Sequence, residues 1–130
     1  MTQVLLDTQV LLWWLSDDAR LGPTSRASIA DGDTRVLVSA ASAWEIAIKR
    51  AIGKLDVPPD LELESVLREE GFQALAIEIR HAERAGDLPA LHRDPFDRML
   101  VAQAGIEKLT LMTADADVRG YDVRTVDASA

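Results

Sequence analysis

The hydrophobic pattern divides the chain into short apolar runs and stretches with helical spacing. Four runs are typical of buried strands and a fifth of an edge strand: 3–6, 35–38, 72–77, 109–112 and, at the edge, 123–126. Helices are predicted between them, at 8–15, 25–30, 39–52, 61–70, 78–85 and from 94 onward. This alternation predicts an α/β fold, in which helices flank a central, mostly parallel sheet on both sides.

The predicted helix at 39–52 repeats apolar residues every three or four positions. We expect this face to be buried; it consists of Trp44, Ile48, Ala51 and Leu55. All three tryptophans of the chain lie in helical patterns, so they are expected in the core rather than on a base-stacking surface. The helix at 61–70 is expected to end at Gly71.

Length and composition indicate a single domain over residues 1–130. The chain is 48% hydrophobic and 28% charged, which is typical of a folded protein. It has no cysteine, so disulfides and thiolate zinc sites are excluded, and a cytoplasmic location is expected. The amino-terminal run lacks a basic region and is interrupted by Asp7, which indicates neither a signal peptide nor a membrane span.

The formal net charge of −8 argues against a general nucleic-acid binder, because such proteins usually carry a basic face. Half of this charge comes from residues 60–70, where five acids oppose one arginine. The basic residues gather elsewhere, in a group around Lys49, Arg50 and Lys54 and on either side of 94–97. The net charge therefore does not exclude an RNA substrate.

Several acids have a local explanation at the start of a helix. Asp7 follows the first predicted strand and precedes the first predicted helix, so its carboxylate can accept the free N–H groups of the first turn. Asp94 and Asp97 flank Pro95 in the pattern of a helix start, with acids at N-cap and N3 and proline at N1.

The remaining acids have local explanations too. Glu45 follows Ser42 at the spacing of a capping box, and it precedes Lys49 by four residues, a favourable helical ion pair. Asp115 and Asp117 follow the strand at 109–112, where either is suited to cap a last helical turn.

The collective arrangement of these acids has a second explanation. Asp7 and Asp115 lie just beyond strands, Glu45 lies one turn into a helix that follows a strand, and Asp97 lies near a helix start. A parallel sheet brings such points to one edge. Carboxylates gathered there repel one another, which raises their pKa values, and a divalent cation removes this penalty. Oxygen-only ligands suit Mg²⁺ or Mn²⁺. The sequence pattern alone leaves both explanations open for each acid.

Other chemistries find little support. The glycine pattern matches no phosphate-binding loop, dinucleotide fingerprint or nucleophile elbow. His81 and His92 are too few for a histidine-based triad or zinc site, and His92 is expected in a solvated loop. A phospho-receiver module also binds Mg²⁺ in an α/β domain. It requires an acid pair after the first strand and a lysine after the last, but Asp7 stands alone and Lys108 precedes its strand.

Four segments resemble, in order, the acidic motifs of PIN-domain nucleases: "LLDTQVLLWWL", "SAASAWEIAIKRAIGKL", "HRDPFDRMLVAQA" and "LTLMTADAD". The likeness is closest to VapC-type toxins of bacterial toxin–antitoxin pairs and extends from Gln3 to Val126. It implies a PIN fold and Mg²⁺-dependent (or Mn²⁺-dependent) endoribonuclease activity on RNA phosphodiester bonds. It also implies a homodimer, and a small antitoxin that inserts a segment into the acidic groove.

The resemblance also assigns roles to individual residues. The implied catalytic and metal-binding residues are Asp7, Glu45, Asp97 and Asp115. Asp94 is an additional acid in the third motif and a further candidate ligand. Apart from the resemblance, their charge makes Lys49, Arg93 and Arg98 candidate contacts to flanking RNA phosphates, with a solvated surface position as the alternative for each. The alternative interpretation is a degenerate PIN domain that only binds, which the complete set of four acids disfavours.

Overall fold

The computed structural model describes residues 2–91 and 93–130, which contain a five-stranded, fully parallel sheet. Its strands are β1 (Thr2–Leu6), β2 (Thr34–Ser39), β3 (Gln73–Leu75), β4 (Thr110–Thr113) and β5 (Thr125–Asp127). The strand order is β3-β2-β1-β4-β5, so β1 lies in the middle. The predicted α/β fold is therefore confirmed, although the third strand is shorter than the predicted 72–77.

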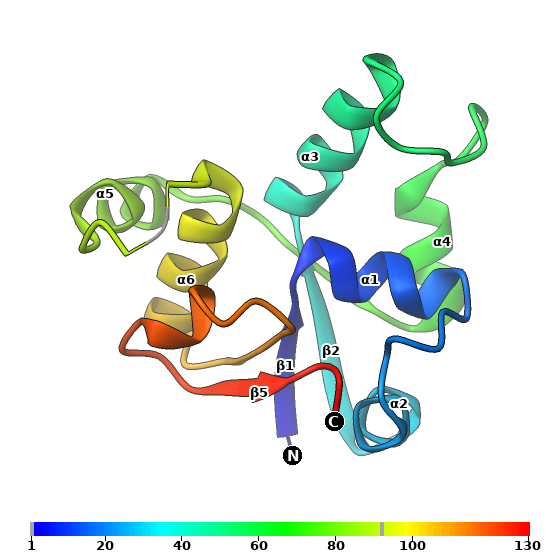
Figure 1. Ribbon diagram of the computed structural model, residues 1–130, viewed down its shortest axis with the longest axis horizontal. Coiled ribbons are helices and arrows are strands. Elements are labelled where there is room, and N and C mark those ends of the chain that lie inside the picture. The colour runs from blue at the N-terminus through cyan, green and yellow to red at the C-terminus, as the bar shows by residue number, and fades with distance from the viewer. Residues whose placement is uncertain (1, 92) are drawn as a thin grey trace.

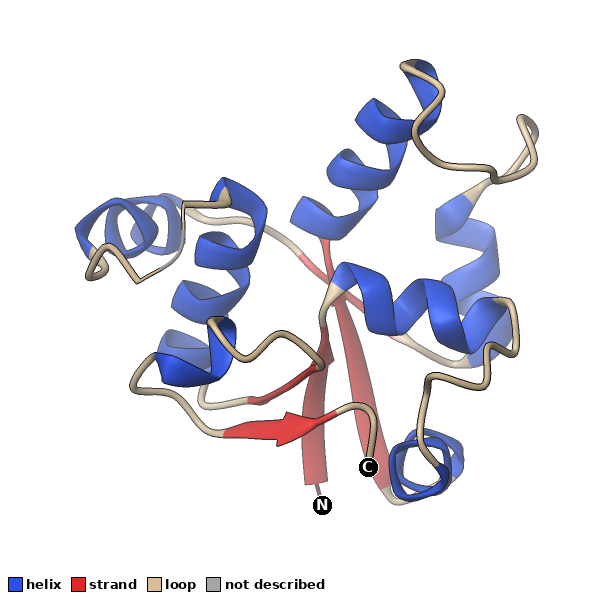
Figure 2. Cartoon of the chain, in the orientation of Figure 1, coloured by secondary structure: helices blue, strands red, loops and turns tan. Residues whose placement is uncertain are grey.

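Helices cover both faces of the sheet (Figures 1 and 2). They are α1 (Thr8–Leu15), α2 (Pro23–Ala30), α3 (Ala40–Ala51), α4 (Leu63–Glu70), α5 (Ile79–Asp87) and α6 (Pro95–Glu107), with a 3₁₀ turn, η1 (Val118–Gly120). In Figure 1, α5 and α6 lie to the left of β1 and β2, and α1, α2 and α4 lie to the right. Within the described part of the chain, no helix has the length and apolar character needed to cross a bilayer.

Alternation along the strands fills two cores. Successive strand residues point to opposite faces, so Val4 and Leu6 belong to the core beneath α1 and α2, whereas Leu5 belongs to the core beneath α6. All three side chains are at most 2% exposed. Such continuously buried strands explain why the sequence shows apolar runs instead of a polar–apolar alternation.

The sheet has a switch point between β1 and β4, where the strand order changes direction. Strands β2 and β3 continue to one side of β1, and β4 and β5 lie on the other. The segments that leave the carboxyl ends of β1 and β4 therefore diverge, which leaves a crevice at this edge of the sheet. Asp7 follows β1 directly, and Ala114 and Asp115 follow β4.

Helix α3 buries a different face from the one predicted. Its buried residues are Ala41, Ser42, Glu45 and Ile46. Trp44 is 64% exposed and forms a T-shaped pair with Phe96, with ring centroids 5.5 Å apart, so the prediction of three core tryptophans is wrong for this residue. The helix rises away from the sheet edge (Figure 1), and its buried residues lie toward its amino end. Of the predicted apolar face, Trp44 and Ala51 are exposed, and Ile48 and Leu55 are partly buried.

The predicted capping box of α3 is also wrong. The N-cap is Ser39, whose hydroxyl accepts the N–H of Ala41 at 3.0 Å. Ser42 lies inside the first turn, where its hydroxyl accepts a hydrogen bond from the hydroxyl of Thr8 at 2.9 Å. Because the helix begins three residues earlier than the box required, Glu45 is released from a capping role. By contrast, Gly71 ends α4 in the left-handed conformation, as predicted.

Candidate metal centre

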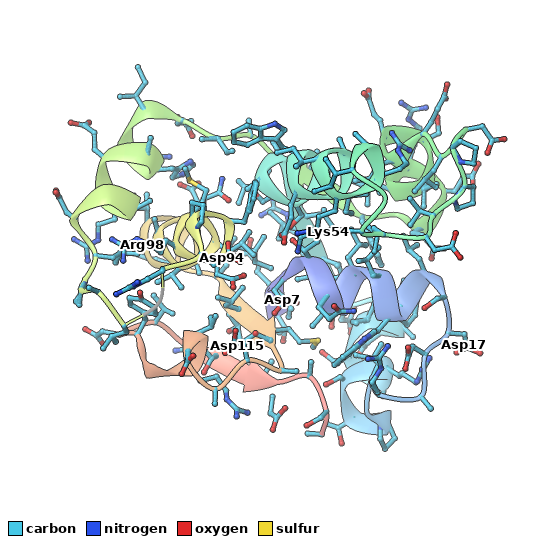
Figure 3. The ribbon with its side chains drawn as sticks, turned by 45° about the horizontal axis from the view of Figure 1, so that its top comes forward. Asp7, Asp17, Lys54, Asp94, Arg98 and Asp115 are labelled. Atoms are coloured by element: carbon cyan, nitrogen blue, oxygen red, sulfur yellow. The ribbon has the colours of Figure 1, made fainter. Side chains whose placement is uncertain are left out.

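A pocket of about 430 Å³ opens at the carboxyl edge of β1 and β4. Its lining contains all five acids that the sequence indicates as candidate metal ligands: Asp7, Glu45, Asp94, Asp97 and Asp115. They come from the end of β1, from α3, from the start of α6 and from the end of β4. Figure 3 shows Asp7, Asp94 and Asp115 around one opening. The topology thus gathers side chains that lie more than a hundred residues apart in the sequence.

Asp7 is both a helix cap and the most central of these acids. Its Oδ1 accepts the N–H of Val10 at 2.8 Å, and the residue is only 6% exposed. Burial raises the pKa of this carboxyl, hydrogen bonds from Thr113 and Val10 lower it, and the charges of Asp115 and Glu45 raise it again. The net effect is a raised pKa, so an ionised Asp7 is disfavoured unless a cation joins it.

Glu45 offers one carboxylate oxygen without a hydrogen-bond partner. It lies in the second turn of α3 and is 5% exposed. Its Oε2 accepts from Nζ of Lys49 at 2.6 Å, which confirms the predicted helical ion pair. Its Oε1 is buried, and no group in the described part of the chain bonds to it. Because an unpartnered buried carboxylate oxygen is costly, this atom is suited to accept a cation.

The two acids of α6 have different local roles. Asp94 is the N-cap, and its Oδ1 accepts the N–H groups of Phe96 at 2.8 Å and Asp97 at 3.3 Å. Asp97 lies in the first helical turn after Pro95 and lines the same pocket. The predicted capping role of Asp94 is therefore confirmed. The carboxylate of Asp97 is not needed for that cap.

A buried threonine links the acids at the ends of β1 and β4. Thr113 is fully buried; its hydroxyl bonds to the carboxylate of Asp7 and accepts the N–H of Asp115 at 3.1 Å. Asp115 in turn accepts the N–H of Asp117 at 2.9 Å, so it shapes the turn that precedes η1. The sequence analysis missed the positioning role of Thr113, although a hydroxyl two residues before an acid at a strand end was a usable signal.

The pocket has the donor set of a hard divalent cation. It presents carboxylate oxygens and neither sulfur nor imidazole among the described lining residues. Three observations fit a bound cation: the unpartnered Oε1 of Glu45, the raised pKa of Asp7, and the proximity of further carboxylates to both. Oxygen ligands of this kind suit Mg²⁺ or Mn²⁺.

The basic residues are distributed differently from the prediction. Lys49 lines the pocket, as does Lys54, which the sequence analysis had not assigned to the site. Arg93 and Arg98 lie outside the pocket lining. The guanidinium of Arg98 donates to the carbonyls of Ala85, Leu88 and Pro89, so it holds residues 85–89 against α6. His92 lies outside the described residues.

A second group of potential ligands lies away from this pocket. Ligand atoms of Glu78, His81 and Glu107 lie within 4.8 Å of one another. However, Nδ1 of His81 accepts the N–H of Glu78 at 3.0 Å, and its Nε2 contacts Glu107 at 3.2 Å. Arg80 pairs with both glutamates, at 3.2 and 2.7 Å. The guanidinium of Arg80 thus already supplies the positive charge beside these glutamates. The contacts of Glu78, His81 and Glu107 are explained by the capping of α5 and its attachment to α6.

Comparison with known proteins decides the family. The PIN domain model matches residues 4–123, which is nearly the whole chain. The chain belongs to the PIN-domain family. This membership overturns the alternative of a phospho-receiver module. No curated protein matches the chain in sequence.

Solved structures share the fold of this PIN domain at low sequence identity. A chain of VapBC2 from Rickettsia felis, bound to a promoter DNA fragment, has a TM-score of 0.70 and 10% identity, and the match covers 97% of this chain and 98% of that one. A chain of DNA-bound VapBC from Salmonella typhimurium has a TM-score of 0.68 and 18% identity, with 98% of both chains covered. A toxin–antitoxin complex from Klebsiella pneumoniae gives 0.64 and 19%, with 96% and 97% covered.

Replacing the central acid of the PIN domain should stabilise the protein in EDTA. Folding raises the pKa of Asp7 above its ordinary value of 3.8, so ionisation of this group opposes folding as pH rises. Asp7→Asn retains an oxygen for the N–H of Val10 and removes the charge. Its gain in unfolding free energy should be small below pH 3.8, grow as pH rises through the folded pKa, and then level off.

Denaturant unfolding at a series of pH values measures this gain. Asp122→Asn, at an exposed position outside the pocket, is the matched control and should show little change. A gain for Asp7→Asn that is the same at every pH would contradict the electrostatic explanation.

Proposed function

We propose that this PIN domain is a metal-dependent endoribonuclease and the toxin of a toxin–antitoxin pair. The observation that carries the proposal is the convergence of five carboxylates on one pocket, with Oε1 of Glu45 buried and unpartnered in the described chain. Clustered carboxylates repel one another, which is a cost to a domain that only binds a partner. A site for Mg²⁺ or Mn²⁺ requires such a cluster, because the carboxylate oxygens are its ligands.

Each acid has a defined part in this proposal. Asp7, Glu45, Asp97 and Asp115 would hold the ion, with Asp94 at the margin. A divalent ion at this position supplies charge neutralisation at the scissile phosphate and lowers the pKa of an attacking water. Thr113 orients Asp7 and Asp115, and Lys49 holds Oε2 of Glu45, which leaves Oε1 for a cation.

Water is the simplest nucleophile for this pocket. The one hydroxyl side chain in its described lining belongs to Thr8, which donates to Ser42 at 2.9 Å and is 7% exposed. An alcohol engaged in this way is not activated for attack, since no base accepts its proton. The proposed reaction is therefore direct hydrolysis of an RNA phosphodiester.

Cleavage should require both the divalent ion and Asp7. The purified, partner-free protein is incubated with total RNA in Mg²⁺, Mn²⁺ or EDTA, and discrete cuts are mapped by primer extension. Asp7→Asn should lower the cleavage rate by about 100-fold or more, because metal stabilisation of the phosphate charge is worth several kcal/mol. Asp122→Asn should cleave normally. Full activity in EDTA, or in Asp7→Asn, would refute the mechanism, and a folded, inactive wild type would identify a degenerate binding domain.

The two acids of α6 should respond in opposite ways to alanine. Asp94→Ala should lose about 0.5–2 kcal/mol of stability, the usual cost of removing an N-cap, and should retain measurable cleavage. Asp97→Ala should nearly abolish cleavage, and its metal-free stability should be unchanged or higher, because repulsion falls. Melting temperature and cleavage are measured for both. An inactive Asp94→Ala beside an active but unstable Asp97→Ala would reverse the assignment.

The proposed role also implies protein partners. Chains of similar fold come from toxin–antitoxin complexes, so we propose that an antitoxin binds this protein and blocks its acidic pocket. We also propose a homodimer, since Ile79 is 80% exposed and Trp44 is 64% exposed. Light scattering should give twice the chain mass of 14.2 kDa. The product of the upstream reading frame should co-purify with this protein and inhibit cleavage. A monomeric mass would contradict the homodimer, and an upstream product without effect on cleavage would contradict the antitoxin partner.

A further inference from the structure

Two lysines line the acidic pocket, and they are bonded differently. Lys49 donates to Glu45 at 2.6 Å; this hydrogen bond raises the pKa of Lys49, and the charges of Asp94 and Asp97 raise it further. Lys54 is exposed on the same lining, and within the described chain its ammonium bonds to none of the five carboxylates. Lys49 is thus paired with a carboxylate, whereas the ammonium of Lys54 is available to another anion.

The end of α3 fixes where Lys54 lies. The N–H of Gly53 donates to the carbonyl of Arg50 at 3.1 Å, and the N–H of Lys54 donates to the carbonyl of Lys49 at 2.8 Å. Together with φ of +72° at Gly53, these two bonds define a Schellman motif, with Gly53 at C′ and Lys54 at C″. The chain therefore turns back on α3 immediately after the helix and returns Lys54 to the pocket.

This motif normally brings two apolar residues together. Its C″ residue commonly makes a hydrophobic contact with C3 or C4, whereas here C″ is Lys54 and C3 is Lys49. Glu45 already satisfies Lys49. Lys54 has no equivalent anion from the described chain.

Lys54 also lies on one side of the pocket opening. In Figure 3, Asp7 lies between Lys54, on the α3 side, and Asp115, on the β4 side. Leu55, the next residue, packs against the hydrophobic core, so the backbone next to Lys54 is anchored. The pocket is therefore acidic around Asp7 and cationic toward the end of α3.

We propose that Lys54 binds a backbone phosphate of single-stranded RNA next to the phosphate that is cleaved. The inference rests on the proposed ribonuclease function and names the residue that aligns the substrate across the pocket. Lys54 thus takes the phosphate-binding role that the sequence suggested for Lys49 and Arg98. The ammonium of Lys49 is bonded to Glu45, and the guanidinium of Arg98 is bonded to backbone carbonyls. A lysine contact to phosphate is independent of base identity and is weakened by salt.

The test separates RNA binding from cleavage. Asp7→Asn is used as a non-cleaving background, and the affinities for short oligo(A) and oligo(U) are measured by fluorescence anisotropy over a range of KCl concentrations. Adding Lys54→Gln should raise Kd for both RNAs by roughly three- to tenfold. It should also flatten the slope of log K against log salt by about 0.7, the value for one lost phosphate contact on a single strand.

Two further variants make the test specific. Lys54→Arg should retain most of the affinity, since it keeps the charge at the same position. Lys108→Gln is the matched control, because Lys108 is an exposed lysine at the opposite end of α6 from the pocket. It should change neither Kd nor the salt slope.

The outcomes distinguish this inference from the proposed function. If Lys54→Gln leaves both Kd and the salt slope unchanged, or alters only the affinity for Mg²⁺, then Lys54 is a counter-ion of the acids and the inference is wrong. A wild-type protein that binds RNA through Lys54 but cuts none refutes the nuclease function and leaves the binding contact standing. An affinity loss restricted to one of the two RNAs would also overturn the inference, because it would indicate base recognition.

Discussion

Mutual repulsion among carboxylates at the carboxyl edge of β1 and β4 is the constraint on which this site depends. Burial and the charges of Asp115 and Glu45 raise the pKa of Asp7, so the folded chain holds this group in a position that opposes its own ionisation. The two hydrophobic cores, one on each face of the sheet, oppose this repulsion, because continuously buried strands keep the ends of β1 and β4 adjacent. The stability of the sheet thus holds the acids in an arrangement that becomes favourable once a cation is bound.

Local backbone bonds make this arrangement possible at low cost. Asp7 caps α1, Asp94 caps α6, and Asp115 closes the turn before η1, so each carboxylate accepts N–H groups while it also faces the pocket. Helix amino termini are favourable places for negative charge, which partly offsets the repulsion between neighbours. An acid that caps a helix is therefore still available to the proposed metal site, and the two explanations that the sequence leaves open for Asp94 and its neighbours are compatible.

Much of this could be predicted from the sequence, because it follows from local patterns. Apolar runs locate the strands, and the parallel topology places the acids that follow them at one edge. The misassigned features depend on tertiary packing. Trp44 has the spacing of a core residue, but α3 rises beyond the sheet and leaves it exposed. Arg98 has the charge of a phosphate ligand, but its guanidinium is committed to backbone carbonyls. Lys54 is brought to the pocket by the turn after α3, which helical periodicity does not describe.

The acidity of the whole chain is compatible with the proposed anionic substrate because of where the acidic residues lie. Half of the net charge of −8 comes from residues 60–70, and none of these lines the pocket. Salt screens exposed charges, so we expect an acidic segment outside the pocket to oppose phosphate binding less than the carboxylates that line it. Under the proposed function, the groups that decide RNA affinity are those that line the pocket: the carboxylates, the ion that they would bind, and Lys54. Binding of RNA should consequently depend on the divalent ion as well as on salt, because the pocket repels phosphate until its carboxylates are neutralised.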